Sequence, residues 1–161
     1  MSEHTRSALP DWEVAARVAI DSLLAAYVAG VDGGPLQELV ELFTEDGVLV
    51  VHGGKEYRGR DGMLSFLTAS RETRGESPVG RIRHFNSRSH VRFDSPTSAS
   101  GTTYFFAMNE AHGVDHWGLY EEDLIALDGV WYFKRRAVVI EGADPGGWIG
   151  SGVAIVSFDR T

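Results

Sequence analysis

The sequence predicts an α+β domain whose sheet is largely antiparallel. Helical periodicity is confined to the first half of the 161-residue chain, and strand patterns fill the second half. The pair Asp128-Gly129 stands between two of these strands, and Asp-Gly is a strong signal for a tight β-hairpin. A chain of this length is typical of one domain. We therefore expect a flexible tail over residues 1–10 and a single domain over residues 11–161.

The first helix is expected over residues 11–31. Ile20 and Tyr27 belong to a set of apolar residues that recur at helical spacing and define one face. Asp11 is of a type that often caps a helix N-terminus. The helix is expected to end at the turn signal Asp32-Gly33-Gly34.

Two more helices and a small hairpin complete the first half. Pro35 suits the start of a second helix, whose inner apolar residues are expected to extend to Phe43. Asp61 is expected to cap a third helix with Met63 and Phe66 on its inner face. The other expected elements are a turn at 44–47, a strand at 48–52, its hairpin partner at 55–58 and a loop at 71–80.

Long strands dominate the second half. They are bounded by turn-forming residues such as Pro, Gly, Ser and Asp and are rich in β-branched and aromatic residues. The expected strands cover residues 82–93, 101–111, 115–127, 130–141 and 149–158.

Composition excludes several classes of function. The formal charge of −8 and the scattered basic residues argue against nucleic acid and anionic membranes as partners. The chain has no cysteine, a polar N-terminus without signal-peptide character, and no apolar run that approaches a membrane span, so we expect a cytoplasmic protein. Phosphate-binding loops and nucleophile-elbow motifs are missing, and no histidine cluster has the spacing of a metal site.

Four stretches of sequence, in this order, carry a resemblance to a known family. They are the run from Tyr27 to Phe43, the run Gly59-Arg60-Asp61-Gly62, the run that begins Arg83-His84-Phe85, and the run from Trp117 to Arg136. Together they resemble the SnoaL-like branch of the nuclear transport factor 2-like superfamily over about residues 12–141. The resemblance implies a cone-shaped α+β barrel, in which a curved, mostly antiparallel sheet and three N-terminal helices enclose a pocket.

The resemblance also implies a site. In the dehydratase branch of the family a Tyr, an Asp five residues later and a His on the first long strand match Tyr27, Asp32 and His84. An imidazole with a pKa of about 6.5 suits proton transfer near neutral pH, and a carboxylate on its other nitrogen fixes the tautomer. We expect Asp32 to orient His84 and Tyr27 to polarise a substrate oxygen. Taken singly, Asp32 suits a turn cap, Tyr27 a core position and His84 a structural role, and it is their joint match to the family spacing that favours a site.

Strand alternation complicates the placement of His84. Strict period-two alternation over residues 82–93 puts His84 on the face of Arg88 and His90, opposite Phe85 and Val91. Either a bulge interrupts the strand, or the polar face meets another subunit.

Six further residues are candidates for substrate binding: His116, Tyr120, Arg136, Phe66, Met63 and Trp131. By resemblance, His116 lies about one residue from a second histidine of some dehydratases. Arg136 either binds a substrate carboxylate or pairs with Asp123, and the pairing is favoured. The apolar members suit a flat apolar substrate, but each suits the core equally.

These residues predict a cofactor-independent lyase, a dehydratase that acts on a small hydroxylated cyclic or polyketide-like molecule. Within enzymes, the alternative is an isomerase or cyclase that uses the same Asp-His pair. Outside enzymes, the alternative is a ligand-binding or assembly subunit similar to a dioxygenase β-subunit. The resemblance further implies a homodimer or homotrimer that associates through the outer face of the sheet.

Overall fold

A computed structural model describes residues 8–151, with the side chain of His52 left out. Residues 1–7 of the expected tail and residues 152–161 lie outside this range. In chain order the elements are α1 (Asp11–Val31), α2 (Leu36–Glu41), β1 (Phe43–Val50), a 3-10 turn (His52–Gly54), β2 (Glu56–Arg58), α3 (Gly59–Gly75), β3 (Ile82–Asn86), β4 (His90–Ser95), β5 (Ser98–Asn109), β6 (Gly113–Leu127) and β7 (Val130–Ala143).

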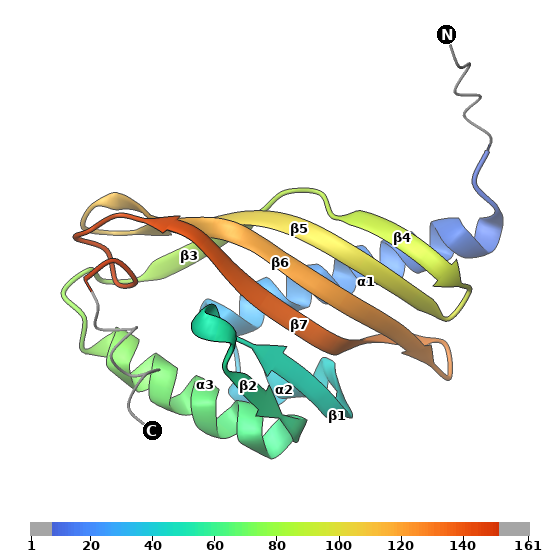
Figure 1. Ribbon diagram of the computed structural model, residues 1–161, viewed down its shortest axis with the longest axis horizontal. Helices are drawn as coiled ribbons and strands as arrows, with labels where there is room; N and C mark the ends of the chain where they lie inside the picture. Colours follow the sequence, from blue (N-terminus) through green and yellow to red (C-terminus); the bar gives the residue numbers. More distant parts are fainter. Residues whose placement is uncertain (1–7, 152–161) are drawn as a thin grey trace, which may run out of the picture.

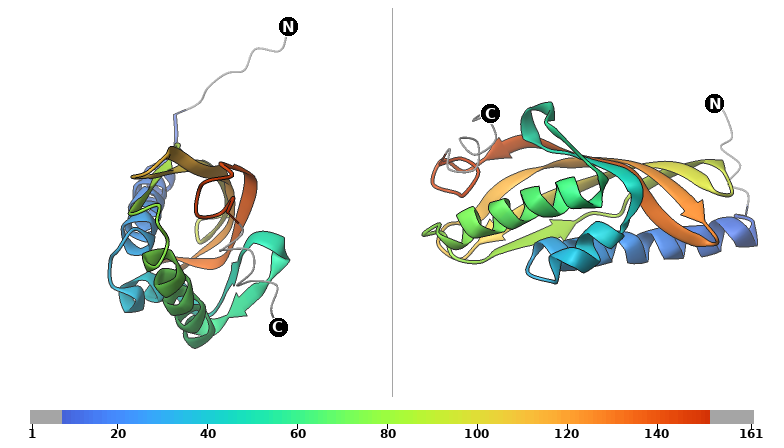
Figure 2. Two further views of the ribbon diagram at one scale, coloured as in Figure 1. Left: turned by 90° about the vertical axis from the view of Figure 1, so that its left-hand side faces the viewer. Right: turned by 90° about the horizontal axis from the view of Figure 1, so that it is seen from below.

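The seven strands form one curved, unclosed sheet (Figure 1). The strand order is β2-β1-β7-β6-β5-β3, and β4 also pairs with β5. The β1–β7 pair is parallel, and the other pairs are antiparallel. Figure 2 shows the strong curvature of the sheet, with α1 and α3 across its open side. The expected α+β cone is confirmed.

Helix α1 has the expected bounds but a different start. The capping position is held by Pro10, whose carbonyl accepts the Glu13 amide at 2.9 Å, so Asp11 lies inside the first turn. By length and composition alone, the 21 residues of α1 could cross a membrane, which corrects the expectation that no such run exists. One face of α1, including Ile20 and Tyr27, is buried in the domain core.

The boundaries after α1 differ from expectation in three places. Helix α2 ends at Glu41, and Phe43 starts β1 instead of lining a helix. The expected turn at 44–47 is strand, because β1 runs through it with a shift of register against β7 between Phe43 and Val48. Helix α3 begins two residues before Asp61 and continues to Gly75, through the first part of the expected loop.

The expected strand at 82–93 is two strands, β3 and β4. Asn86 pairs with Phe105 and His90 pairs with Thr102. The four residue steps from Asn86 to His90 are therefore matched by only three steps on β5, which leaves one extra residue between β3 and β4. The extra residue reverses the side-chain parity: His84 and Asn86 are half-buried, whereas His90 is exposed and Val91 is buried. The bulge that the alternation problem suggested is present.

The β6–β7 hairpin forms at the expected Asp128-Gly129 pair. Both residues have positive φ, of 49° and 81°, as a primed two-residue turn requires. The expected strand at 149–158 is not found where the structure describes it, since residues 144–151 contain turns and no strand. The remainder of that prediction, residues 152–158, lies outside the described residues.

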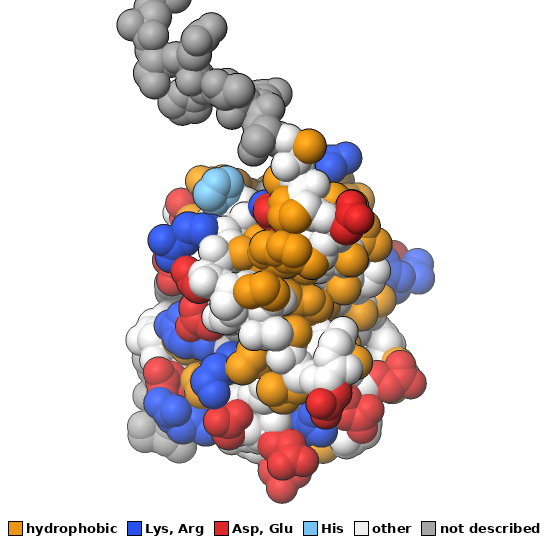
Figure 3. Space-filling view, turned by 90° about the vertical axis from the view of Figure 1, so that its right-hand side faces the viewer, with side chains coloured by type: hydrophobic (Ala, Val, Ile, Leu, Met, Phe, Trp, Pro, Cys, Tyr) orange, Lys and Arg blue, Asp and Glu red, His pale blue; other side chains and the backbone are white. Residues whose placement is uncertain are grey.

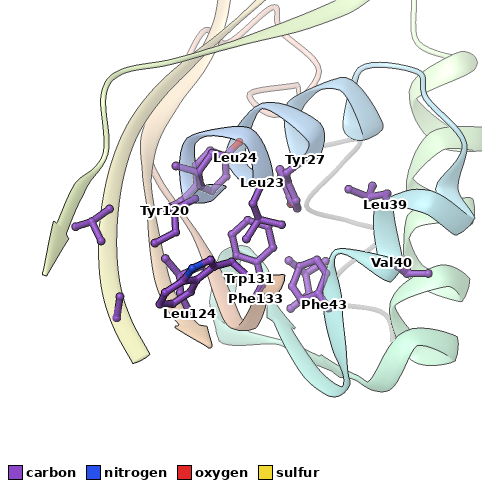
Figure 4. Close-up of a cluster of buried hydrophobic side chains, with 14 of the residues drawn as sticks. Leu23, Leu24, Tyr27, Leu39, Val40, Phe43, Tyr120, Leu124, Trp131 and Phe133 are labelled. Carbon is purple, nitrogen blue, oxygen red and sulfur yellow. The ribbon is translucent and has the colours of Figure 1, made fainter. Parts of the chain in front are cut away.

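The main core lies between α1, α2 and the sheet. Figure 4 shows its centre, where Tyr27 from α1, Phe43 from β1 and Phe133 from β7 converge. At the end of the molecule where α1 begins, apolar side chains gather on the surface (Figure 3). There the exposed Trp12 contacts Phe93 edge to face at 5.4 Å.

Candidate active site

A cavity of about 120 Å³ lies between the helices and the concave face of the sheet. Most of its wall is apolar, with Leu49, Phe66, Phe105 and Ile140 contributed by four different elements. The polar members of the wall are few: Tyr27, Ser70, Arg71, Arg74, His84, His116 and Tyr120. A small apolar cavity with convergent polar groups is the usual form of a small-molecule site.

The first titratable pair joins the end of α1 to the edge of the sheet. Asp32 holds the C-cap position of α1, and its Oδ1 lies 2.7 Å from Nδ1 of His84. The same carboxylate accepts the backbone N–H of His84 at 3.1 and 3.2 Å. The amide is available because β3 is an edge strand that pairs only with β5. Asp32 therefore fixes both the backbone and the ring of His84.

This contact determines what the His84 ring can do. A carboxylate accepts hydrogen bonds and cannot donate them, so Nδ1 of His84 carries the proton and Nε2 keeps a free lone pair when the ring is neutral. Burial lowers the pKa of His84 from its ordinary 6.5, although the hydrogen bond to Asp32 opposes the shift. His84 is therefore neutral near pH 7 and able to accept a proton.

A second pair of the same kind brings His116 to the wall, and only its histidine was predicted from the sequence. Oδ1 of Asp115 lies 2.7 Å from Nδ1 of His116, and both side chains are almost fully buried. Asp115 also accepts the Asn109 side-chain amide at 2.8 Å and the Trp148 backbone N–H at 2.7 Å. Burial alone would raise the pKa of Asp115, but these three hydrogen bonds outweigh it and lower the pKa to about 2.

A bulge explains why two neighbouring residues of β6 both point inward. On β5, Ala107 pairs with His116 and the next residue, Met108, pairs with Val114, so Asp115 is the extra residue of a β-bulge. Regular alternation would have placed Asp115 on the outer face. The sequence signal that could have identified it is the Asp-His pair itself, two neighbouring polar residues between the apolar Val114 and Trp117.

The two histidines face one another. Their ring centroids are 5.5 Å apart, and the ring of Phe105 lies within 6.1 Å of both. Both imidazoles line the cavity, whereas Asp32 and Asp115 support them from behind. The fold thus brings two carboxylate–imidazole pairs to the wall of one small, mostly apolar cavity.

Tyr27 and Tyr120 line the cavity above a buried cation. The guanidinium of Arg136 lies 4.0 Å from the centroid of each tyrosine ring. Its Nη1 is 3.1 Å from Oε1 of Glu122, and both side chains are fully buried. Burial raises the pKa of both tyrosine hydroxyls and of the Glu122 carboxyl. The tyrosines therefore stay protonated and can donate hydrogen bonds, but they cannot act as bases near pH 7.

The predicted pairing of Arg136 with Asp123 is wrong by one residue. Arg136 pairs with Glu122, whereas Asp123 points to the opposite, exposed face of β6 and lies in register with Arg135. Buried beneath the tyrosines, Arg136 supports the cavity wall and does not form part of it.

The apolar candidates separate into two groups. Phe66 lines the cavity and stacks on Tyr57 at 4.1 Å. Met63 is fully buried in the core, and Trp131 packs against Phe93 toward the end where α1 begins. Of the six substrate-binding candidates, His116, Tyr120 and Phe66 thus lie in the wall. Across residues 8–151, no group of three or more His, Asp or Glu side chains is arranged to hold a metal ion.

Comparison with known proteins places these residues in a family. The sequence profile described as SnoaL-like domain matches residues 12–137. No curated protein matches the chain.

Solved structures share the fold at low sequence identity. A proposed scytalone dehydratase from Novosphingobium aromaticivorans is 24% identical over 84% of this chain and 91% of its own, with a TM-score of 0.72. A Mycobacterium tuberculosis protein whose function is described as unknown is 22% identical over 91% and 90%, with a TM-score of 0.77. A type 2 hexachlorocyclohexane dehydrochlorinase is 19% identical over 83% and 90%, with a TM-score of 0.72.

Proposed function

The chain belongs to the SnoaL-like domain family, and from that premise we propose that it is a cofactor-independent lyase. Its reaction is the removal of water from a small hydroxylated cyclic or polyketide-like molecule in the cavity. The observation that carries the proposal is the pair of imidazoles, each oriented by its own carboxylate, that face one another at 5.5 Å. Elimination needs a base and an acid on one substrate, and this arrangement supplies both.

His84 is proposed as the base. Its Nε2 takes a proton from the carbon next to a carbonyl group, and Asp32 stabilises the imidazolium that forms. The hydroxyl of Tyr27, which burial keeps protonated, donates to the substrate oxygen on which negative charge develops.

His116 is proposed as the acid. The buried Asp115 carboxylate holds Nδ1 of His116, and a ring that starts the cycle protonated can deliver a proton from Nε2 to the departing hydroxyl. The C–O bond breaks, water leaves, and the electron pair of the broken C–H bond forms the new C=C bond. His84 then holds the proton taken from carbon, and His116 has lost its own proton to the departing water. Proton exchange with solvent restores both rings.

The size and surface of the cavity limit the substrate. At about 120 Å³ it is smaller than the roughly 300–1,000 Å³ typical of sites for drug-sized ligands. Phe66, Phe105 and Ile140 offer flat apolar contacts, so a single ring or a short chain fits best. Two of the similar structures are named for eliminations, of water and of hydrogen chloride, which supports this reaction class.

The test is a screen of hydroxylated cyclic ketones and short β-hydroxy ketones for loss of one water by mass spectrometry. His84→Ala and Asp32→Asn are expected to lower turnover by about 10²–10⁴-fold, with folding retained. His90→Ala, on the exposed face of β4, is the matched control and should keep the wild-type rate. Near-wild-type turnover in both site variants would contradict the proposal.

The same screen separates the alternatives. An isomerase with the same Asp32–His84 pair would move a proton between carbons without any change of mass. A non-catalytic subunit would turn over no compound, yet its buried Asp115–His116 pair would then have no use beyond support of the fold.

We also propose that the protein is a homodimer or homotrimer that associates through the outer face of the sheet. Phe85 and Phe106 stack there at 5.1 Å and are 47% and 41% exposed. Tyr104 and Trp117, on β5 and β6, are exposed as well. Sedimentation equilibrium should give a mass above that of one chain, which Phe106→Glu should reduce. A wild-type monomer at all concentrations would contradict the proposal.

A further inference from the structure

Two arginines of α3 lie in the wall of the cavity, and the reaction described above uses neither. Arg71 and Arg74 are one helical turn apart on α3 and line the same cavity as the two histidines. The Nη2 of Arg71 donates to the Gly30 carbonyl at 2.9 Å, and the Nη2 of Arg74 donates to the Val31 carbonyl at 2.9 Å. Both acceptors belong to the last turn of α1, where free carbonyls attract cations.

These contacts leave most of each guanidinium unused. A guanidinium has five N–H donors in a planar fork, and the support of α1 employs a single nitrogen of each arginine. The Nε of Arg71 is buried and has no hydrogen-bond partner among the described residues. A buried donor without a partner is rare in proteins, and it indicates a place that a ligand oxygen can fill.

The local charge also lacks an anion. Burial lowers the pKa of Arg74, and the neighbouring positive charge of Arg71 lowers it further, against the attraction of Asp32. The Asp32 carboxylate is already bonded to the ring and amide of His84. Arg74 thus has two neighbouring cations, Arg71 and Arg83, and one carboxylate that is already committed, so an additional negative charge is favoured beside it.

An anion can reach these side chains from solvent. Arg71 and Arg74 also line a surface hollow of about 440 Å³, together with Asp32 and the ion pair of Arg81 with Glu110. The two arginines therefore line both the cavity and a hollow open to solvent, so a negatively charged molecule in the hollow can reach them.

We propose that Arg71 and Arg74 form a subsite for a carboxylate on the substrate, so that the substrate is a small anionic molecule. This inference rests on the proposed function only in that it concerns the same cavity. A carboxylate matches the planar fork of a guanidinium and can receive two parallel hydrogen bonds from it. It would also hold the apolar remainder of the substrate against Phe66 and below the two imidazoles.

The test compares the binding of benzoate with that of benzamide, its neutral isostere, by isothermal titration calorimetry. Wild-type protein should bind benzoate at least tenfold more tightly. Arg71→Gln and Arg74→Gln should each weaken benzoate binding by about ten- to a hundredfold and leave benzamide unchanged. Arg92→Gln removes the same charge from an exposed site on β4 and should change neither.

Lysine variants keep the test decisive if a glutamine variant fails to fold. Arg71→Lys and Arg74→Lys can still donate to the end of α1, and they should lose the bidentate part of benzoate binding. Equal affinity for benzoate and benzamide, or no binding of benzoate, would overturn the inference. Repetition of the titrations with His84→Ala separates the two proposals, because benzoate binding does not need the base. Preferential binding of benzoate can be found even if the elimination screen fails, and the elimination screen can succeed even if benzoate is not preferred.

Discussion

Replacement of Asp115 by Asn tests whether the second carboxylate–imidazole pair is held as tightly as the geometry implies. The substitution keeps the shape of the side chain but exchanges one acceptor for a donor. The carboxylate receives hydrogen bonds from His116, from Asn109 and from the Trp148 backbone, at 2.7, 2.8 and 2.7 Å. An amide cannot satisfy donors on both sides, so at least one buried donor loses its acceptor.

The expected loss of stability follows from the pKa of Asp115. A fall from the ordinary 3.8 to about 2 corresponds to about 2 kcal/mol, at roughly 1.36 kcal/mol per pH unit. Because the pKa is lower in the folded state, this stability is fully present above about pH 4 and is lost as the pH falls toward 2. The unsatisfied donor adds about 1–3 kcal/mol. We therefore expect Asp115→Asn to lower the free energy of unfolding at pH 7 by about 3–5 kcal/mol.

The assay is urea unfolding of wild type and Asp115→Asn at pH 7 and pH 3, with thermal unfolding alongside. For a domain of this size the loss corresponds to a fall in Tm of roughly 6–20 °C. The difference in stability between the two proteins should shrink at pH 3. At that pH Asp115 is largely protonated in the unfolded wild type, so part of the stability that the carboxylate provides is lost. Asp123→Asn makes the same change on the exposed face of β6 and should stay within about 0.5 kcal/mol. A Tm equal to that of the control would refute the reasoning.

Three further outcomes are expected. Arg136→Met should destabilise the protein by about 3–5 kcal/mol in urea, because it leaves a buried carboxylate unpaired, whereas Lys134→Met at an exposed position should change little. NMR titration should give His84 a pKa below 6.5, because burial disfavours the charged ring. Any activity that needs neutral His84 should fall only below that pKa. A value above 6.5 would contradict the assignment. Gly118→Ala places a methyl carbon 1.9 Å from the Val139 carbonyl oxygen, so it should lower the free energy of unfolding by about 1–3 kcal/mol or prevent folding. Gly62→Ala in α3 meets open space and should raise the free energy of unfolding by about 0.4–1 kcal/mol.

Much of the fold could be predicted because its strongest signals are local. The apolar face of α1 and the Asp128-Gly129 turn depend on residues close together in the chain, and both are found as expected. The boundaries at β1 and α3 were missed because tertiary pairing overrides local turn preference there. Phe43 is drawn into the sheet by its pairing with Phe133, which no local pattern records.

The site could be predicted only in part, and bulges are the reason. Each of the two histidines lies beside a one-residue insertion in a strand, and such an insertion reverses which residues face inward. For this reason alternation misplaced His84 and gave no indication that Asp115 points into the domain. Arg71 was missed because it falls in a stretch expected to be loop, whereas α3 continues through it.

The most direct test of the two-histidine site is a double-mutant comparison on a substrate found by the water-loss screen. His84→Gln and His116→Gln should each lower kcat by about 10²–10⁴-fold. If the two rings work as one acid–base unit, the double variant should lose little more than the slower single variant. Near-wild-type turnover in either single variant, or losses that simply multiply in the double variant, would contradict the account.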